Sequence, residues 1–282
     1  MPRVELRHIP LKPPSRWAPF RRTLPRLTLG LFVIGIVAVC VEAWRADHLE
    51  RLRWSQAALL GLAVLTTTIS LARRLPAQNV ILGSALILLG VGAIECLNAA
   101  SGVPFGPQVF ETRLGPKVFG LLSWPVPFLW LIAIFSCRGV ARLVLRPWRH
   151  GPNYGWWVIA VAVVLVSLFN LAFEPFAAVL NRYWTWQPTL LPGTWYGAPW
   201  VSVLGEAVTT LLILAFVTPV LINKQPGKPP PPDYHPVVVW LLLNLLFLSG
   251  YIHHRLWPAA TLIAGQTVVA SCFMLRALRT KN

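Results

Sequence analysis

Long apolar runs alternate with short polar segments along the whole chain. A helix needs about 20 apolar residues to cross a hydrocarbon core of roughly 30 Å. The pattern predicts eight such helices, each rich in Leu, Val, Ala and Ile and almost free of charge: Leu27–Trp44, 55–72, 79–97, 118–136, 155–173, 200–223, 236–252 and 258–276. We therefore expect an all-α protein, a polytopic transmembrane helix bundle of about eight spans.

Composition and charge agree with a membrane location. Hydrophobic residues make up 56% of the chain and charged residues 12%, against roughly 25% charged in soluble domains. The net charge of +16 would elsewhere suggest a nucleic-acid partner, but here the basic residues lie between the apolar runs, where they set topology. With the N-terminus inside, the inner segments hold 18 Lys and Arg and the outer segments hold 7. We expect both termini on the cytoplasmic side of the cell membrane, and no nucleic-acid partner.

The same pattern divides the chain into segments. Residues 1–26 form a basic cytoplasmic segment, 27–276 an integral membrane domain and 277–282 a cytoplasmic tail. The first apolar run is too long for a signal-peptide core and lacks a small-residue cleavage site, so we expect it to remain as a helix. A Pro-rich stretch at 225–236 predicts a stiff polyproline loop on the cytoplasmic side.

The positions of the few acidic residues relative to the predicted spans indicate a candidate site. Glu95 and Glu206 lie within apolar spans, Glu174 follows the fifth span, and Glu42 and Glu111 lie at or beyond span ends. In the predicted topology all five face the outer side. An ionisable group inside a span costs several kcal/mol, so such residues usually face the bundle interior and mark a site or pathway. A carboxyl group in an apolar pocket can keep its proton near neutral pH and act as a proton donor. Proton conduction and purely structural hydrogen bonding are the competing interpretations.

Two outer connections, 101–117 and 174–199, are rich in Gly and Pro, which favours fixed turns or re-entrant segments over regular helices. The second connection also carries five Trp and Tyr residues. Trp184 and Trp186 are two residues apart and would share one side of an extended segment. These aromatics either anchor the protein at the membrane interface or line a cavity beside the carboxyl groups. Such a cavity would suit a long apolar ligand or a developing carbocation.

Several familiar chemistries lack their sequence signals. The six His residues show no HxxxH grouping, no aspartate-rich DxxxD pair is present, and no glycine-rich nucleotide motif occurs. The four Cys residues form no CxxC pair. We therefore expect no metal and no cofactor.

The two outer connections carry a recognisable series of short motifs. The first runs Glu95, Gly102, Pro104, Phe105 and Gly106, then Leu114, Gly115 and Pro116, and leads to a span with Pro127 and Trp130. The second has Glu174 and Pro175, Trp184 and Trp186, then Tyr196, Gly197 and Pro199. In order and spacing they resemble the membrane-bound carotenoid 1,2-hydratases of the CruF type, over about residues 30 to 220. The chain departs from that pattern where it has Gln108, Phe110, a Glu-Pro in place of the usual Asp-Pro, and Ser202 to Glu206.

The resemblance implies a carotenoid biosynthesis enzyme, a hydro-lyase. It would add water to the C1–C2 double bond of an acyclic end group, of the lycopene or γ-carotene type, to give a 1-hydroxy carotenoid. On this basis we expect three catalytic carboxyl groups, with Glu95 as acid, Glu174 as its partner and Glu206 as the third. The expected substrate-binding residues are Pro104, Phe105, Gly106, Trp184, Trp186 and Tyr196.

The partners expected on the same basis are the carotenoid substrate, membrane lipid and other carotenoid biosynthesis enzymes. Two alternatives stay open. One is a non-enzymatic membrane protein that binds carotenoid or another polyisoprenoid. The other is a proton-coupled transporter, which the intramembrane acids would suit, although the internal symmetry of many transporters is not visible in this sequence.

Overall fold

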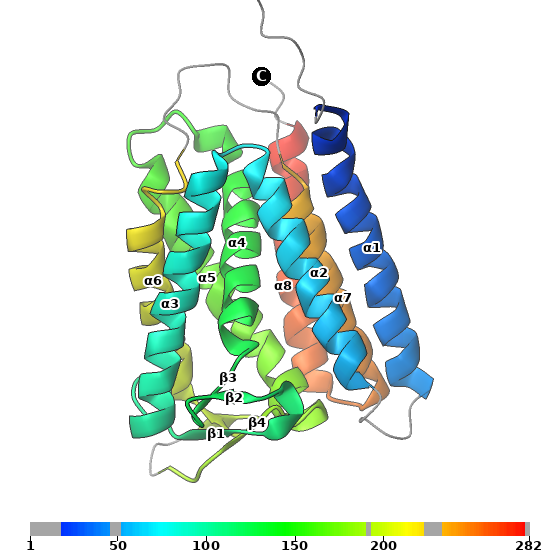
Figure 1. The fold of residues 1–282 in the computed structure, drawn as a ribbon, viewed down its shortest axis with the longest axis vertical. Coiled ribbons are helices and arrows are strands. Elements are labelled where there is room, and N and C mark those ends of the chain that lie inside the picture. Colours follow the sequence, from blue (N-terminus) through cyan, green and yellow to red (C-terminus); the bar gives the residue numbers. More distant parts are fainter. Residues whose placement is uncertain (1–17, 46–51, 190–192, 223–232, 280–282) are drawn as a thin grey trace, which may run out of the picture.

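Eight helices form a single bundle in the computed structural model, which describes residues 18–45, 52–189, 193–222 and 233–279 (Figure 1). The helices are α1 (Ala18–Arg45), α2 (Leu52–Ala72), α3 (Ala77–Ser101), α4 (Val126–Val144), α5 (Tyr154–Glu174), α6 (Trp200–Val217), α7 (His235–His253) and α8 (Trp257–Arg279). All eight are long and apolar enough to cross a membrane. The prediction of an all-α bundle with eight spans is confirmed. The start of α1 and the end of α8 lie at the same end of the bundle (Figure 1).

Helix α4 is the central element. It contacts α2, α3, α5, α7 and α8, and most of its side chains are buried, as expected for a mainly apolar helix with neighbours on several sides. A glycine allows one of these close approaches, because a Cβ on Gly139 would lie 2.4 Å from Cβ of Pro236 on α7. The other helices each bury only part of their surface.

The two Gly- and Pro-rich connections meet at one end of the bundle and form what we call the β cap (Figure 1). Strand β1 (Gln108–Phe110) from the first connection pairs antiparallel with β4 (Trp184–Trp186) from the second. Two short hairpins complete the cap, β2 (Lys117–Val118) with β3 (Leu122–Ser123) and β5 (Thr194–Trp195) with β6 (Ala198–Pro199). Between α5 and β4 the chain continues as a π-helical turn, Pro175–Leu180. The expected fixed turns are therefore small β elements.

Two predicted span boundaries are wrong. The fourth span was expected at 118–136, but the helix is Val126–Val144, and residues 117–123 form the β2–β3 hairpin instead. Phe119, at the tip of this hairpin, has a φ of +53° and is 88% exposed. The apolar residues of the hairpin resemble the start of a span in sequence, whereas the helix begins at Val126, with Pro125 at its N-cap. The sixth span was expected to reach residue 223, but α6 ends at Val217.

The predicted segment boundaries are only partly covered by the structure. Residues 1–17 of the basic segment, residues 223–232 of the Pro-rich loop and residues 280–282 of the tail lie outside the described residues. The side of the membrane on which each end lies stays a prediction.

Candidate active site

A cavity of about 150 Å³ lies between the helices beside the β cap. Its walls come from α2 through α7 and from strands β1 and β4, and they are mainly aliphatic and aromatic. Three carboxyl groups line it, those of Glu95, Glu174 and Glu206. The sequence predicted these three residues as one site, and the fold brings them together from three different helices.

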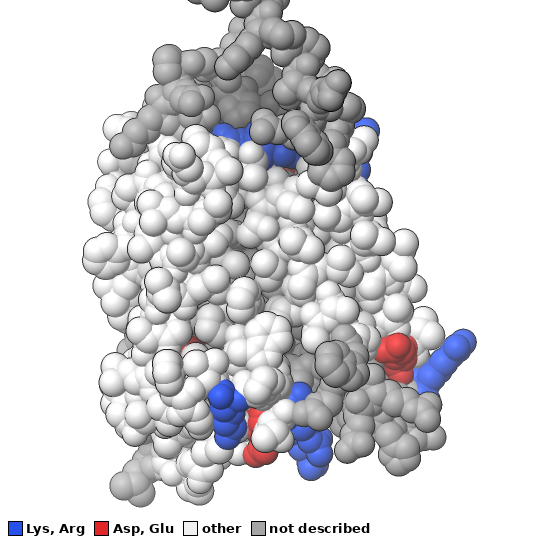
Figure 2. All heavy atoms as spheres, in the orientation of Figure 1, with Lys and Arg blue, Asp and Glu red and all other residues white. Residues whose placement is uncertain are grey.

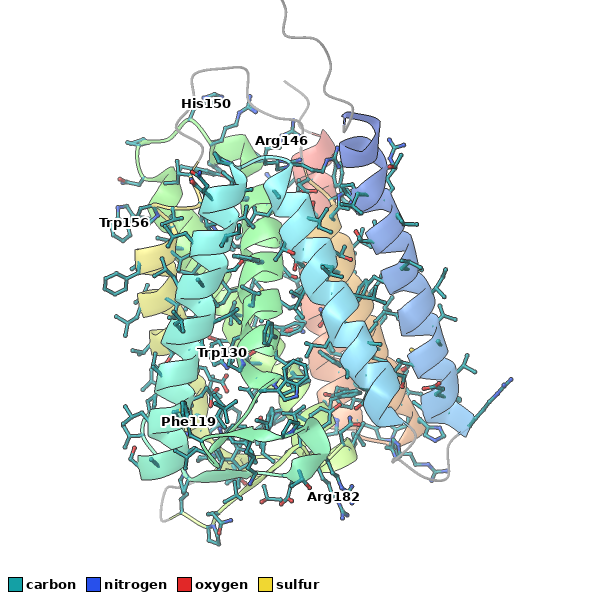
Figure 3. The ribbon with its side chains drawn as sticks, viewed as in Figure 1. Phe119, Trp130, Arg146, His150, Trp156 and Arg182 are labelled. Carbon is teal, nitrogen blue, oxygen red and sulfur yellow. The ribbon has the colours of Figure 1, made fainter. Side chains whose placement is uncertain are left out.

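Glu95 is held by two N–H donors. Its side chain, on α3, is 4% exposed. Its Oε1 accepts a hydrogen bond from the indole Nε1–H of Trp130 on α4 at 2.8 Å, and its Oε2 accepts one from Nε2–H of Gln108 on β1 at 3.2 Å. Trp130 lies in the half of the bundle next to the β cap (Figure 3). Both oxygens of Glu95 therefore have a donor, and the carboxyl group is fixed in orientation.

Glu174 is held by two tryptophans. It ends α5 and is 6% exposed. Its Oε1 accepts hydrogen bonds from Nε1–H of Trp184 at 3.0 Å and of Trp186 at 2.6 Å. Alternate residues of a strand share one face, so β4 directs both indoles at the same oxygen. This confirms the prediction that the two tryptophans lie on one side of an extended segment. Because an indole N–H can only donate, this oxygen is held as an acceptor.

The third carboxyl group, that of Glu206 on α6, is half-buried. It is within hydrogen-bonding reach of Asn170 on α5 and close enough to Glu95 and Glu174 for the charges to interact. The three groups therefore form one electrostatic cluster. By contrast, Glu42 is exposed at the end of α1 and Glu111 is only partly buried, and neither lines the cavity.

The pairing of β1 with β4 positions donors for two of the carboxyl groups. Gln108, which binds Glu95, is the register partner of Trp186, which binds Glu174. Phe110 and Trp184 form the other end of the ladder and meet edge to face, with ring centroids 6.0 Å apart. A single short ladder thus joins the supports of Glu95 and Glu174.

The Pro-Phe-Gly turn places one aromatic ring in the cavity. Phe105 is 3% exposed, lines the cavity and stacks on Trp130 with centroids 6.0 Å apart. Its backbone N–H donates to Oδ1 of Asn98 at 2.8 Å. Gly106 has a φ of +109°, which favours glycine, and a Cβ there would lie 2.9 Å from Cγ of Pro199. This glycine therefore shapes the turn that presents Phe105.

The predicted substrate-binding residues fall into two groups. Phe105, Trp184 and Trp186 line the cavity, whereas Pro104, Gly106 and Tyr196 are not among its lining residues. Tyr196 packs instead against Trp195, edge to face with centroids 4.9 Å apart. The tyrosine belongs to the β5–β6 turn, where it has a φ of +51°.

Some residues of the site were not assigned a role by the sequence. Gln108 and Trp130 each bind Glu95, but they follow it by 13 and 35 positions. Asn170 beside Glu206 and the ring of Phe173, which meets Trp184 edge to face at 5.9 Å, also lie in the walls. A polar residue inside an apolar span, as with Asn170, is a signal that could have been used.

Tyr183, which lies outside the membrane-spanning segments, is a buried ionisable group in the wall of this cavity. Its hydroxyl donates to Oε1 of Gln56 on α2, and Nε2–H of Gln56 donates to Oδ1 of Asn181 at 2.8 Å. Burial raises the pKa of Tyr183 above its ordinary value of 10, so it is neutral at physiological pH. The described residues contain no grouping of three or more His, Cys, Asp or Glu that could hold a metal ion.

Comparison with known proteins shows the family to which the chain belongs. A search of curated proteins and a search of solved structures each found no match. The family described as carotenoid biosynthesis protein matches residues 54–270, which includes the whole β cap and all three cavity carboxyl groups. With this match over most of its length, and with eight membrane-spanning helices, the chain is a multi-pass member of the carotenoid biosynthesis protein family.

Proposed function

We propose that this protein is a carotenoid 1,2-hydratase, a hydro-lyase that adds water to the C1–C2 double bond of an acyclic carotenoid end group. The observation that carries the proposal is the cluster of Glu95, Glu174 and Glu206 around one cavity with apolar and aromatic walls. Such walls suit a polyene end, and carboxyl groups supply the proton transfers that hydration needs. Membership of a carotenoid biosynthesis family supports a carotenoid as substrate.

In the proposed reaction, the carboxyl group of Glu95 gives its proton to C2, and the double-bond electrons form the new C–H bond. The tertiary cation left at C1 is captured by water, which forms the C–O bond. The surplus proton of that water passes to Glu174. The net change is one water added, and a proton returned from Glu174 to Glu95, through Glu206 or solvent, resets the site.

The surroundings of Glu174 support its role. The two indole N–H groups hold one oxygen of Glu174 as an acceptor and orient the carboxyl group that takes up the proton. The rings of Phe105, Trp184 and Phe173 line the cavity, and aromatic faces can stabilise a cation by about 0.5–2 kcal/mol each. The proposed chemistry uses substrate, water and these side chains.

Pigment analysis tests the proposal. A host that makes acyclic carotenoids is compared with and without the protein, together with a Glu95→Gln, Glu174→Gln double variant expressed to the same level. A new, more polar pigment heavier by one water, found only with the wild-type protein, is the expected result. Unchanged pigments at good expression would contradict the hydratase.

A second candidate function is non-enzymatic binding of a carotenoid or another polyisoprenoid, favoured by the mainly apolar walls of the same cavity. It predicts that unmodified pigment copurifies with the protein in detergent and that the double variant retains it. Copurification of unchanged pigment without any hydrated product would favour this function over the hydratase. The cell membrane, with other carotenoid biosynthesis enzymes as neighbours, is the location we propose for either function.

A further inference from the structure

A second hollow, of about 190 Å³, lies at the end of the bundle opposite the β cap. We call it the arginine pocket, because five arginines line it: Arg74, Arg138, Arg142, Arg146 and Arg149. Asp233 is the one acid among its described lining residues. Figure 2 shows basic side chains at this end as well as at the β-cap end, and Figure 3 labels Arg146 at this end, far from Trp130.

Arg138 is the most informative member. It lies inside α4, six positions before the helix ends at Val144, and is 6% exposed. One Nη2–H donates to the carbonyl oxygen of Leu221 at 3.1 Å, but the buried Nε–H has no hydrogen-bond partner among the described residues. A buried cation and a buried donor without a partner are both unfavourable. Arg138 lines the arginine pocket, and a buried donor without a partner at such a place calls for an explanation, which a bound ligand would supply.

Other arginines near Arg138 add positive charge that a bound anion would balance. Arg142 follows Arg138 by four positions, so both guanidinium groups lie on one side of α4. Burial lowers the pKa of Arg74, Asp233 opposes this, and the nearby charges of Arg142 and Arg73 lower it further. A preference for basic residues on the cytoplasmic side explains exposed arginines at this end, but it does not explain a buried one with an orphaned donor.

Asp233 does not supply the missing negative charge. Its Oδ2 is 3.3 Å from Nε of Arg74 and accepts the hydroxyl of Ser70 at 2.8 Å. Its Oδ1 accepts the backbone N–H of His235 at 3.2 Å and meets the His235 ring at 2.9 Å. Asp233 is therefore committed to the junction of α2 with α7, and within the described part of the chain neither Arg138 nor Arg142 forms an ion pair with a carboxylate.

We propose that the arginine pocket binds an anion that carries a phosphate group. Guanidinium groups match phosphate oxygens in charge and in the spacing of their paired donors, and basic pockets between transmembrane helices bind lipid head groups. The phosphate comes either from an anionic membrane lipid or from a soluble phosphate or diphosphate. The site is separate from the carboxyl cluster and does not depend on the proposed hydration.

The test uses the full-length protein, purified in a neutral detergent and stripped of loosely held lipid. Inorganic phosphate, diphosphate, dioctanoyl phosphatidylglycerol and dioctanoyl phosphatidylcholine are titrated separately, and the thermal unfolding midpoint and calorimetric binding are measured. Lipid phosphorus that copurifies is measured as well. A saturable rise of the midpoint by a few degrees is expected. Responses to phosphate or diphosphate assign a soluble anion, and a response to phosphatidylglycerol alone, or retained lipid phosphorus, assigns a head group.

Variants separate this site from general charge effects. Arg142→Gln changes an exposed residue at the pocket wall and should weaken binding, or reduce retained phosphorus, by tenfold or more. Arg73→Gln removes the same charge from an exposed neighbour outside the lining and should leave binding unchanged. Asp233→Asn should strengthen binding, because it removes the opposing charge. Equal weakening by Arg142→Gln and Arg73→Gln would overturn the proposal. So would the combination of no saturable response and no difference in retained phosphorus.

Discussion

Glu95 and Glu174 face the same cavity, but their supports differ. Glu95 is held through both oxygens by residues of α4 and β1, whereas Glu174 has two tryptophans on one oxygen. Two carboxyl groups in one site with different surroundings are the usual basis for separate acid and base roles. Because the two carboxyl groups have different hydrogen-bond donors, the acid role of Glu95 and the base role of Glu174 can be tested by separate substitutions.

The first prediction concerns Glu95. Glu95→Gln keeps the size and hydrogen-bonding reach of the side chain but cannot supply an acidic proton. General acid catalysis typically contributes about 10²–10⁴-fold, so the rate of hydration should fall by that factor while the protein still inserts and binds pigment. Near-normal turnover by a well-expressed variant would remove Glu95 from the acid role and direct attention to Glu206.

The second prediction concerns the indole donors. Trp186→Phe keeps an aromatic ring in the cavity wall but deletes the 2.6 Å hydrogen bond to Glu174. A hydrogen bond to a charged group contributes about 1.5–3 kcal/mol, so hydration should fall about tenfold or more. The matched control is Trp195→Phe, which deletes a 2.9 Å bond to the carbonyl oxygen of Leu171 instead. Equal losses in the two variants would contradict a role through Glu174.

At the scale of the elements, helix α6 and the Pro-Phe-Gly turn are packed without spare space. A Cβ on Gly205 would lie 2.7 Å from the carbonyl oxygen of Pro104 and 3.0 Å from Cδ1 of Phe105. The contacts are to backbone and to a buried ring, so neither neighbour can move cheaply. Gly205 thus fixes the distance between α6, which carries Glu206, and the turn that presents Phe105.

The third prediction is that Gly205→Ala lowers both stability and hydration. Overpacking of this kind typically costs about 1–3 kcal/mol, and the displaced turn should move Phe105 in the cavity wall. Gly61→Ala in α2 is the control, because nothing lies within 4 Å of its added Cβ. The thermal unfolding midpoint should fall for the first variant and stay level or rise for the second. The same midpoint for both would refute the tight packing at Gly205.

The junction of α2 and α7 gives the fourth prediction. Burial alone would raise the pKa of Asp233, but the His235 and Ser70 hydrogen bonds and the Arg74 charge outweigh it and lower the pKa below its ordinary 3.8. A carboxylate whose pKa is lowered by folding adds stability that is present above that ordinary value and lost as the pH falls below it. Asp233→Asn should therefore lower the unfolding midpoint at pH 7, with a loss of about 1–3 kcal/mol.

As the pH falls from about 3.8 through the lowered pKa of the folded protein, the wild-type carboxylate loses its charge, and the midpoints of Asp233→Asn and wild type should approach each other. Glu42→Gln, at an exposed position, serves as the control and should leave the midpoint unchanged at both pH values. A constant difference between Asp233→Asn and wild type at all pH values would argue against this ion pair as the cause.

For the molecule as a whole, the apolar pattern was sufficient to predict the eight helices, and together with the family resemblance it indicated the three carboxyl groups that line the cavity. Charge is so costly inside a span that Glu95 and Glu206 had few alternatives to an interior position. The β cap could not be predicted in the same way. Its long-range ladder pairs β1 with β4, from Gln108 and Trp186 to Phe110 and Trp184, and short strands with this separation leave no periodic signal in the sequence.

The arginine pocket could not be predicted from the sequence for a different reason. Counting Lys and Arg indicates sidedness, but it cannot distinguish an exposed arginine from Arg138, which α4 carries into the interior. Likewise, Val118 and Leu122 read as part of a membrane span although they pair across a hairpin. Burial and pairing depend on neighbours distant in the chain, and hydropathy is a local quantity.

The fifth prediction concerns topology. With eight spans and the excess of basic residues at one end, both termini and the arginine pocket should face the cytoplasm, and the β cap should face the other side. Reporter fusions at the C-terminus and after residue 190 should label opposite sides of the membrane. A fusion after residue 150 should report the same side as the C-terminus. Labelling of the C-terminal fusion and the fusion after residue 190 on the same side would contradict the predicted topology.

The β1–β4 ladder also sets the order in which the protein can mature. Its two strands are made at different times, because β4 leaves the ribosome only after α4 and α5 have been synthesised. Until then Glu95 has Trp130 within the nascent chain, but the strand carrying Gln108 has no partner and Glu174 has no indole donors. The cavity therefore closes late in biogenesis, and a chain halted before β4 is a membrane protein without a finished site.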